Sequence, residues 1–164
     1  MVYITNHTFP EDSVYHEHFC RFPNISLSPF QKWSIKAIVD EDHSLITAHT
    51  GSGKTLPAEF AIQYFVEKKK KVIYTTPIKA LSNTKLADLR KKYPHISFGI
   101  ITGDITENPD ADVLIMTTEI LPATILAKRA KKSTAHVAPL AFEMDFDHEL
   151  AAVIFDEVHY NGKT

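Results

Sequence analysis

The chain has few cysteines, which cross-link small proteins, and few glycines and prolines, which interrupt regular structure. It contains one cysteine in 164 residues, which excludes a disulfide within the chain, and only five glycines and nine prolines, too few for a fibrous or low-complexity protein. No apolar run approaches the ~20 residues that span a membrane, and the first ten residues do not resemble a secretion signal. We therefore expect a soluble, intracellular protein with one globular core.

Charge of neither sign dominates the sequence. It has 18 lysines and arginines against 20 aspartates and glutamates, a formal net charge of −2. This balance argues against a protein that holds nucleic acid through bulk positive charge. Any contact with a polyanion is expected to be local.

Short β-branched runs alternate with longer amphipathic ones along the chain. Strands are predicted at residues 44–48, 72–76, 96–101, 113–116 and 152–156, and helices at residues 54–69, 79–92 and 118–130. Because most of these strands are apolar without alternation, they predict an α/β fold whose central, mostly parallel sheet is covered on both faces. Ligands of such sheets bind at the carboxyl ends of the strands.

Two regions fit this alternation less well. Residues 1–28, which contain Pro10 and Pro23 and are followed by Pro29, are predicted to form an extended lead-in packed on the domain. Residues 131–150 mix opposite charges and indicate a surface excursion before the last strand. Within it the alternation of Phe142, Met144 and Phe146 allows a short added strand.

The most informative segment follows the first predicted strand and leads into the first predicted helix: Thr50-Gly51-Ser52-Gly53-Lys54-Thr55. Glycines let successive backbone N–H groups turn toward phosphate oxygens, and the helix N-terminus adds partial positive charge. Lys54 can then reach the β- and γ-phosphates of ATP, while the Thr55 hydroxyl coordinates Mg²⁺. The usual pattern begins with glycine where this chain has Ala48, a tolerable change because the turn depends on Gly51 and Gly53.

A second group of candidates ends the last predicted strand. Asp156 is placed to hold Mg²⁺ through water, and Glu157 to orient and polarise the water that attacks the γ-phosphate. Two adjacent acids at a strand end are often only a solvated corner. Their significance here comes from the phosphate loop in the same chain.

These two motifs together resemble superfamily 2 helicases of the DExH-box type, in particular the superkiller-type RNA helicases that feed RNA to the exosome. The residues that carry the resemblance are Gly51-Ser52-Gly53-Lys54-Thr55, Thr76-Pro77-Ile78-Lys79-Ala80-Leu81-Ser82-Asn83, Gly99 with Ile101-Thr102-Gly103-Asp104, Thr117-Thr118-Glu119-Ile120-Leu121, and Asp156-Glu157-Val158-His159. The resemblance covers about residues 20–160, and the excursion before the last strand is similar to versions from large DNA viruses. It implies the first RecA-like domain of such a helicase, a three-layer P-loop NTPase sandwich over residues 29–164.

The resemblance also implies a groove that grips the backbone of a single nucleic-acid strand. Its candidate contacts are Pro77, Lys79, Asn83, Thr102, Gly103, Asp104, Thr117, Thr118 and Glu119. Hydroxyls and N–H groups at helix starts bind phosphates without reading sequence, and residues 117–119 can at the same time be an ordinary helix cap. For the adenine of ATP the resemblance implies stacking on Phe22 and a hydrogen bond from Gln31, although Phe22 is equally interpretable as a core residue.

The end of the chain departs from the family pattern. His159 resembles the histidine that links hydrolysis to strand engagement, with packing under the last turn as the alternative. After Tyr160 the family continues with an Ile-Asn-Asp stretch and an arginine-glycine, whereas this chain has Asn161-Gly162-Lys163-Thr164. The arginine finger and the second RecA-like domain would lie beyond residue 164. We therefore expect this chain alone to hydrolyse ATP barely above background.

The expected function is the ATP-binding domain of an ATP-dependent RNA helicase, which couples hydrolysis of Mg-ATP to translocation and unwinding. Two alternatives stay open. One is a truncated, non-catalytic module that binds nucleotide or RNA, and the other is a DNA helicase domain. Contacts with the strand backbone do not distinguish RNA from DNA in a sequence.

Overall fold

The computed structural model describes residues 5, 7–10, 14–131, 142 and 144–158. The chain divides into two compact units, residues 1–63 and 64–164, and each is described by itself. The predicted boundary between a lead-in and a domain at residues 28 and 29 stays a prediction. In the part of the chain that the structure describes, no helix is both long and apolar enough to cross a membrane.

The first unit is built from helices and an aromatic cluster. Helix α1 (His16–Phe19) lies within the predicted lead-in, and α2 (Pro29–Val39), which the sequence analysis missed, follows it. Phe9 is buried, and its ring packs against the rings of Phe19 and Trp33 at centroid distances of 5.3 and 4.7 Å. The described part of the lead-in packs on α2, and because it contains α1 it is not extended throughout, which corrects that part of the prediction.

The predicted strand at residues 44–48 was wrong. Residues 42–49 form no helix or strand, and the side chain of Leu45 is 81% exposed. A strand is stable only when its backbone groups pair with a neighbouring strand. The described residues of the first unit contain no other strand that could supply those partners, and a run as short as Leu45-Ile46 buries too little surface to compensate.

The second unit contains a five-stranded sheet in the order β3-β2-β4-β1-β5. Helix α3 (Thr55–Glu67) contains the boundary between the two units. The elements of the second unit that follow α3 are β1 (Lys71–Thr76), α4 (Lys79–Lys92), β2 (Phe98–Ile101), β3 (Thr106–Glu107), β4 (Val113–Thr117), α5 (Ile120–Lys131) and β5 (Leu150–Phe155). The pairs β1–β4, β1–β5 and β2–β4 are parallel, and only the short β3 is antiparallel to its neighbour. The predicted α/β fold with a mostly parallel sheet is therefore confirmed.

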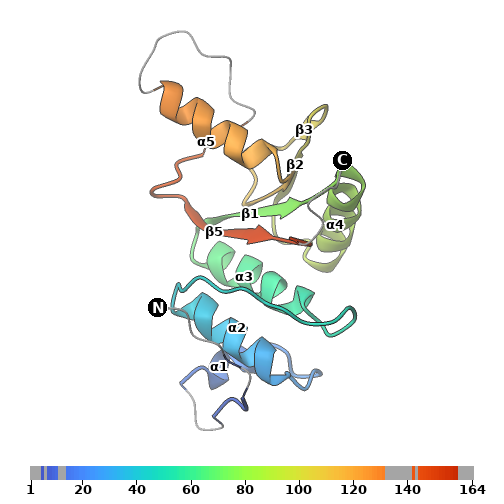
Figure 1. Ribbon diagram of the computed structural model, residues 1–164, viewed down its shortest axis with the longest axis vertical. Helices are drawn as coiled ribbons and strands as arrows, with labels where there is room; N and C mark the ends of the chain where they lie inside the picture. Colours follow the sequence, from blue (N-terminus) through green and yellow to red (C-terminus); the bar gives the residue numbers. More distant parts are fainter. Residues whose placement is uncertain (1–4, 6, 11–13, 132–141, 143, 159–164) are drawn as a thin grey trace. The chain divides into compact units, whose positions relative to one another are not determined.

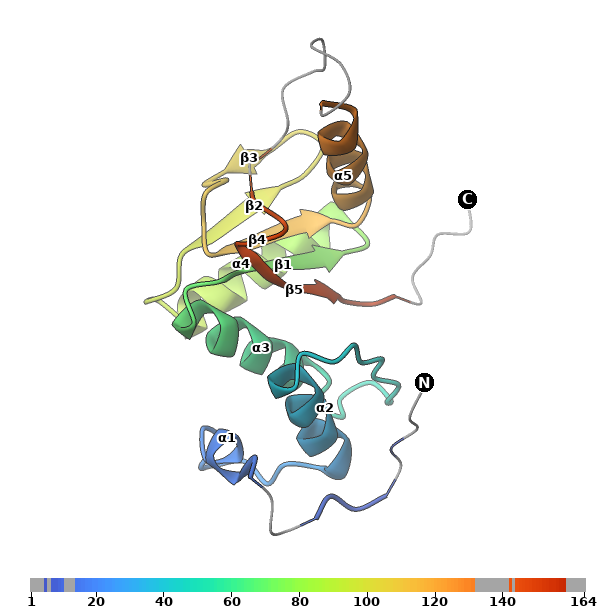
Figure 2. The ribbon, with the colours of Figure 1, turned by 90° about the vertical axis from the view of Figure 1, so that its left-hand side faces the viewer.

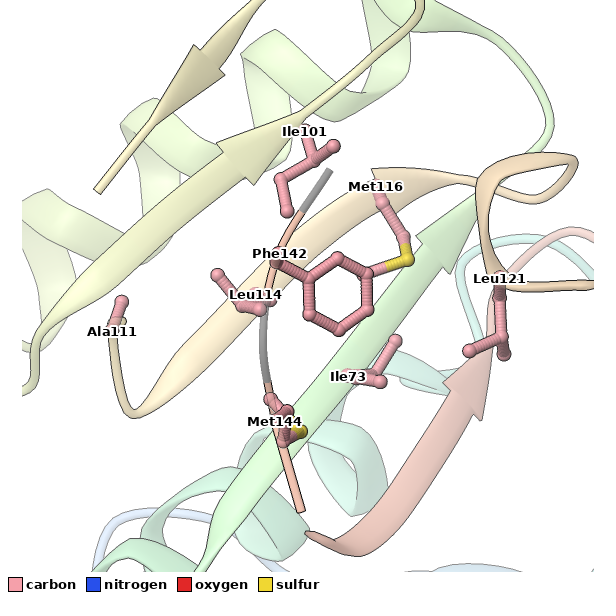
Figure 3. Packing of buried hydrophobic residues seen from close by; sticks show 8 residues of the cluster. All are labelled: Ile73, Ile101, Ala111, Leu114, Met116, Leu121, Phe142 and Met144. Atoms are coloured by element: carbon pink, nitrogen blue, oxygen red, sulfur yellow. The ribbon is translucent and has the colours of Figure 1, made fainter. Parts of the chain in front are cut away.

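Helices cover both faces of this sheet, with α4 on one side and α5 on the other (Figures 1 and 2). Strands β1 and β4 are buried almost throughout, as their apolar runs without alternation predicted. The prediction was wrong for the third such run, residues 153–155 of β5, which is only partly buried, with Phe155 52% exposed, because β5 is the last strand in the order of the described sheet. Figure 3 shows the cluster on the α5 side, where Leu121 of α5 meets side chains from β1, β2 and β4. The cluster consists of Ile73, Ile101, Ala111, Leu114, Met116, Leu121, Phe142 and Met144.

The excursion before β5 contributes to the core, which corrects the prediction that it lies on the surface. Phe142 and Met144 are 3% and 2% exposed and pack against the β1, β2 and β4 side chains of the cluster (Figure 3). The added strand is absent from the described residues 142 and 144–149. Their alternation buries apolar side chains without strand pairing, because the α5 face of the sheet supplies an apolar surface for them.

Candidate functional site

The loop before α3 has the backbone of a phosphate-binding turn. Gly51 and Gly53 have φ angles of 82° and 84°, in the left-handed region that glycine adopts without cost. Ser52 between them donates its N–H to the carbonyl of His49 at 3.3 Å, which closes the turn. Thr55 then begins α3, so the loop delivers the chain to a helix N-terminus, as predicted.

The side chains of this loop fit a phosphate ligand. The Ser52 hydroxyl is buried and has no hydrogen-bond partner among the residues that the structure describes. Lys54 lies half-buried and donates its ammonium to the carbonyl of Ala48 at 2.7 Å, while Thr55 is exposed at the helix start. A buried unpaired hydroxyl costs free energy, which an accepting phosphate oxygen would recover.

Gln31 lies directly behind this loop. It is 5% exposed, and its Nε2 donates to the carbonyl of Gly53 at 3.1 Å while its Oε1 accepts from the N–H of Ser28 at 2.9 Å. A Cβ on Gly53 would meet Nε2 of Gln31 at 2.6 Å, so the glycine also makes room for this amide. The described contacts of Gln31 support the loop, and its bond to adenine stays a prediction.

Phe22 packs on the helix that follows the loop. It is half-buried, and its ring lies 6.4 Å from that of Phe60, a fully buried residue of α3. The contact fits the interpretation as a core residue. It leaves the ring half-exposed, so stacking on adenine stays a prediction as well.

In the second unit the remaining candidates gather at one edge of the sheet. Parallel strands end at the same edge, and Pro77 follows β1, Thr102 follows β2, Thr118 follows β4 and Asp156 follows β5. Four motifs far apart in the sequence are therefore brought to the carboxyl ends of neighbouring strands, where ligands of such sheets bind.

Asp156 is held by three groups at the end of β5. Its N–H continues the sheet by donating to the carbonyl of Thr75 at 3.0 Å. Its Oδ2 accepts from the hydroxyl of Tyr74 at 2.6 Å, and its Oδ1 accepts from the N–H of Glu157 at 3.0 Å. Glu157 is exposed, with a φ of 53°, a left-handed conformation that costs a non-glycine residue about 1 kcal/mol and that often occurs at functional positions.

The candidate nucleic-acid residues after β1 and β4 are tied to each other. Thr118 donates both its N–H and its hydroxyl to the carbonyl of Thr76, at 2.9 and 3.0 Å. The hydroxyl of Thr76 in turn lies 2.7 Å from that of Ser82 in α4. Thr117 is buried, and its hydroxyl has no partner among the described residues. The two turns therefore form one hydrogen-bonded surface.

Lys79 and Asp104 are joined by an ion pair in which the Lys79 ammonium donates to Oδ2 of Asp104. The hydroxyl of Thr102 donates to Oδ1 of Asp104 at 3.1 Å. These two donors, the Lys79 ammonium first, hold the pKa of the Asp104 carboxyl below its ordinary value. The structure thus pairs two residues that were predicted to contact nucleic acid separately.

The remaining candidate contacts for nucleic acid lie at the same edge of the sheet, and among the described residues their side chains show no ion pair or hydrogen bond like that of Lys79 with Asp104. Asn83, Gly103 and Glu119 are exposed, and Pro77 is half-buried in the turn after β1. A Cβ on Gly103 would meet no heavy atom within 4 Å, so space does not require glycine there. His159 lies outside the described residues.

The donor set also fits Mg²⁺ when it is bound to phosphate. Within the described ranges, no group of three or more His, Cys, Asp or Glu side chains could hold a metal by themselves. Magnesium usually takes one or two protein oxygens and completes its shell with phosphate oxygens and water. Thr55 carries a hydroxyl and Asp156 a carboxylate, oxygen donors of this kind, and their use by Mg²⁺ stays a prediction.

Comparison with known proteins assigns the family. The model of the DEAD/DEAH box helicase family matches residues 28–164, most of the chain. The chain belongs to the DEAD/DEAH box helicases. The family assignment agrees with the helix α2, the phosphate loop and the acidic end of β5, all of which lie within the matched residues.

Individual relatives belong to the DExH group that the motifs indicated. The helicase domain is 42% identical over 135 residues to the ATP-dependent RNA helicase mtr4 of Schizosaccharomyces pombe, 42% over 134 residues to the antiviral helicase SKI2 of Saccharomyces cerevisiae, and 38% over 134 residues to the exosome RNA helicase MTR4 of Homo sapiens. Each alignment covers 82% of this chain, but 11%, 9% and 11% of the relative. The chain therefore spans about a tenth of the length of these relatives.

Sequence reasoning missed two residues of the helicase domain that contact Asp156. Tyr74 was counted only as part of an apolar strand, and Lys85 only as part of a helix. A tyrosine in a strand buried on both faces requires a partner for its hydroxyl, which was an available signal. Lys85 lies between the buried residues Ser82 and Leu89 of α4, a spacing that turns it toward the sheet.

Proposed function

We propose that this chain is the ATP-binding part of an ATP-dependent RNA helicase. The observation that carries the proposal is the loop at residues 50–55, where two left-handed glycines place a buried, unpaired Ser52 hydroxyl before the N-terminus of α3. Backbone N–H groups, a helix end and a lysine in this order form a cradle for phosphates.

Each side chain of the cradle has a distinct role in the proposal. The backbone of residues 51–53 and the Ser52 hydroxyl bind phosphate oxygens, and Lys54 releases the Ala48 carbonyl to neutralise the terminal phosphates. Thr55 and Asp156 hold Mg²⁺, which when bound neutralises the charge that develops on the phosphate oxygens. Glu157 orients the water that attacks the terminal phosphate, and His159 links this step to the bound strand.

The adenine and the RNA are assigned to separate groups. Gln31 and Phe22 bind the adenine. The contact of Gln31 with Gly53 of the phosphate loop and the packing of Phe22 against Phe60 of α3 support this assignment.

The RNA backbone binds along the carboxyl edge of the sheet, where the Lys79 side chain carries a positive charge and half-buried Thr118 begins the turn after β4. Thr102 is buried, with its hydroxyl bonded to Asp104, so its contribution would come from positioning that turn. The curated relatives support RNA over DNA, because their names describe RNA helicases and exosome function.

Replacement of Lys54 by alanine tests the nucleotide site. Lys54→Ala removes the ammonium that reaches the terminal phosphates, so we expect ATP binding measured by calorimetry to be abolished. The fold should be retained, because the described bond of Lys54 joins it only to the nearby Ala48 carbonyl. Thermal unfolding of both proteins checks this.

A lysine elsewhere in the chain provides the matched control. Lys91 is exposed in the last turn of α4, so Lys91→Ala removes the same charge without touching the loop. This variant should bind ATP as the unmodified chain does. Unchanged ATP affinity in Lys54→Ala, or an equal loss in Lys91→Ala, would contradict the proposed site.

A further inference from the structure

The side chain of Tyr74 reaches from β1 to the carboxylate of Asp156 on β5. The two strands are parallel, and Tyr74 is in register with Ile154, two residues before Asp156. From this position the tyrosine hydroxyl donates to Oδ2 of Asp156 at 2.6 Å. The bond joins residues that are 82 positions apart in the sequence.

Tyr74 is held more rigidly than an exposed donor would be. The residue is 2% exposed and lies in the middle of the sheet between β4 and β5, so packing restricts its ring to one orientation. The Asp156 side chain is 34% exposed and reaches solvent. A fixed donor therefore meets an acceptor whose other side is open.

Lys85 of α4 approaches the same oxygen in a different way. Its Nζ lies 3.6 Å from Oδ2 of Asp156 and 5.4 Å from the centre of the Tyr74 ring. The first distance is too long for a good hydrogen bond, and the lysine chain has many rotamers. Lys85 thus adds positive charge near the carboxylate but does not define its direction.

The remaining oxygen of Asp156 accepts from the backbone N–H of Glu157 at 3.0 Å. Each carboxylate oxygen can accept more than one hydrogen bond, so these two bonds fix the plane of the carboxylate and leave lone pairs for a metal-bound water. Removing a group that hydrogen-bonds to a metal ligand and so orients it commonly lowers the metal affinity of the site 10- to 100-fold.

We propose that Tyr74 is a positioning residue for Asp156, whose hydroxyl sets the orientation in which this carboxylate holds hydrated Mg²⁺ beside bound nucleotide. The inference rests on the proposed function, because it requires Asp156 to act on Mg²⁺. It concerns a residue outside the motifs in which the candidate catalytic residues lie. Lys85 is a charged neighbour of the carboxylate and opposes the metal by its charge.

The test measures the contribution of Mg²⁺ to nucleotide affinity. Calorimetry gives the dissociation constant of ATP for this chain with saturating Mg²⁺ and with EDTA, and the ratio of the two is the magnesium effect. Tyr74→Phe keeps the ring and removes the hydroxyl. We expect the magnesium effect to fall about tenfold in this variant, with little change in the affinity measured in EDTA.

Thr75→Val is the matched control. Thr75 is the next residue of β1, is fully buried, and also donates its hydroxyl to β5, at 3.2 Å from the carbonyl of Ile154. Its loss should lower stability without altering the magnesium effect. A fall in the magnesium effect of Thr75→Val equal to that of Tyr74→Phe would overturn the proposal, because any weakened β1–β5 contact would then suffice.

Lys85→Met distinguishes the contribution of the Tyr74 hydroxyl from that of the ion pair between Lys85 and Asp156. It also tests the proposal if Tyr74→Phe does not fold. It keeps the tyrosine bond and removes a positive charge, so the magnesium effect should rise severalfold. A fall would show that the ion pair orients Asp156, and an unchanged magnesium effect in folded Tyr74→Phe would equally overturn the role of Tyr74. Absence of any ATP binding by the unmodified chain would instead overturn the proposed function itself.

Discussion

Gln31 connects the start of α2 to the phosphate loop, because its amide donates to the carbonyl of Gly53 at 3.1 Å and accepts from the N–H of Ser28 at 2.9 Å. The amide is buried, and a Cβ on Gly53 would lie 2.6 Å from its Nε2, so a side chain there would displace Gln31. The conformation of the loop and the first turn of α2 are therefore coupled through one side chain.

Replacement of Gln31 by glutamate should weaken both stability and nucleotide binding. The carboxylate of Gln31→Glu can still accept from Ser28 but cannot donate to the Gly53 carbonyl, which is left facing an oxygen. We expect the free energy of unfolding to fall by about 1–3 kcal/mol and ATP affinity to fall about tenfold. Urea unfolding and calorimetry measure the two effects.

Gln63→Glu is the control for this substitution. Gln63 of α3 makes a similar amide bond to the carbonyl of Glu59 at 3.3 Å, away from the loop, so ATP affinity should be retained there. Comparison of ATP with GTP separates the two roles of Gln31. Equal losses for both nucleotides in Gln31→Glu support the loop contact alone, whereas a selective loss of ATP supports the adenine bond. Undiminished stability and affinity would contradict the coupling.

Gly99 and Gly103 should respond very differently to alanine. A Cβ on Gly99 of β2 would lie 2.1 Å from the carbonyl oxygen of Asn108 and 2.9 Å from that of Glu107, both backbone atoms of the β3 hairpin. Gly99→Ala is therefore expected to lower the free energy of unfolding by about 3 kcal/mol. Gly103→Ala meets nothing within 4 Å and should change it by less than about 0.5 kcal/mol. Similar urea midpoints for the two variants would contradict the packing of β3 on β2.

The pair formed by Lys79 and Asp104 should limit the affinity for RNA. In Asp104→Asn the ammonium of Lys79 is no longer neutralised, so we expect affinity for a single-stranded RNA to rise about two- to fivefold at low salt. Lys79→Ala should weaken binding and reduce the slope of log affinity against log salt by about one. Fluorescence anisotropy of a labelled oligonucleotide measures both. Weaker binding by Asp104→Asn would instead show that Asp104 itself contacts the strand.

The pH dependence of stability checks that this pair exists in solution. Lys79 and Thr102 hold the pKa of Asp104 below its ordinary value, so the carboxylate stabilises the folded state above that ordinary value. The stabilisation is lost as pH falls through the lower pKa of the folded state. The difference in stability between the unmodified chain and Asp104→Asn should therefore be complete above about pH 4 and disappear in stronger acid. A pH-independent difference would contradict the pairing.

Local sequence pattern was sufficient for much of the fold. The apolar runs of β1, β4 and β5 and the periodicity of α3 and α4 predicted these elements within a few residues. The prediction failed at residues 44–48, because a short apolar run specifies a strand only where a partner strand is available. It also placed Phe142 and Met144 outside the core, because an alternating pattern does not say which surface it meets.

The sequence by itself determined the family, the phosphate loop and the arrival of four motifs at one sheet edge, since these depend on residue order and on the common direction of parallel strands. Only the tertiary structure decided how the side chains at that edge are paired. The bond of Tyr74 to Asp156, the ion pair of Lys79 with Asp104 and the support of Gly53 by Gln31 join residues 82, 25 and 22 positions apart. Such contacts depend on strand register and helix placement, which no local pattern encodes.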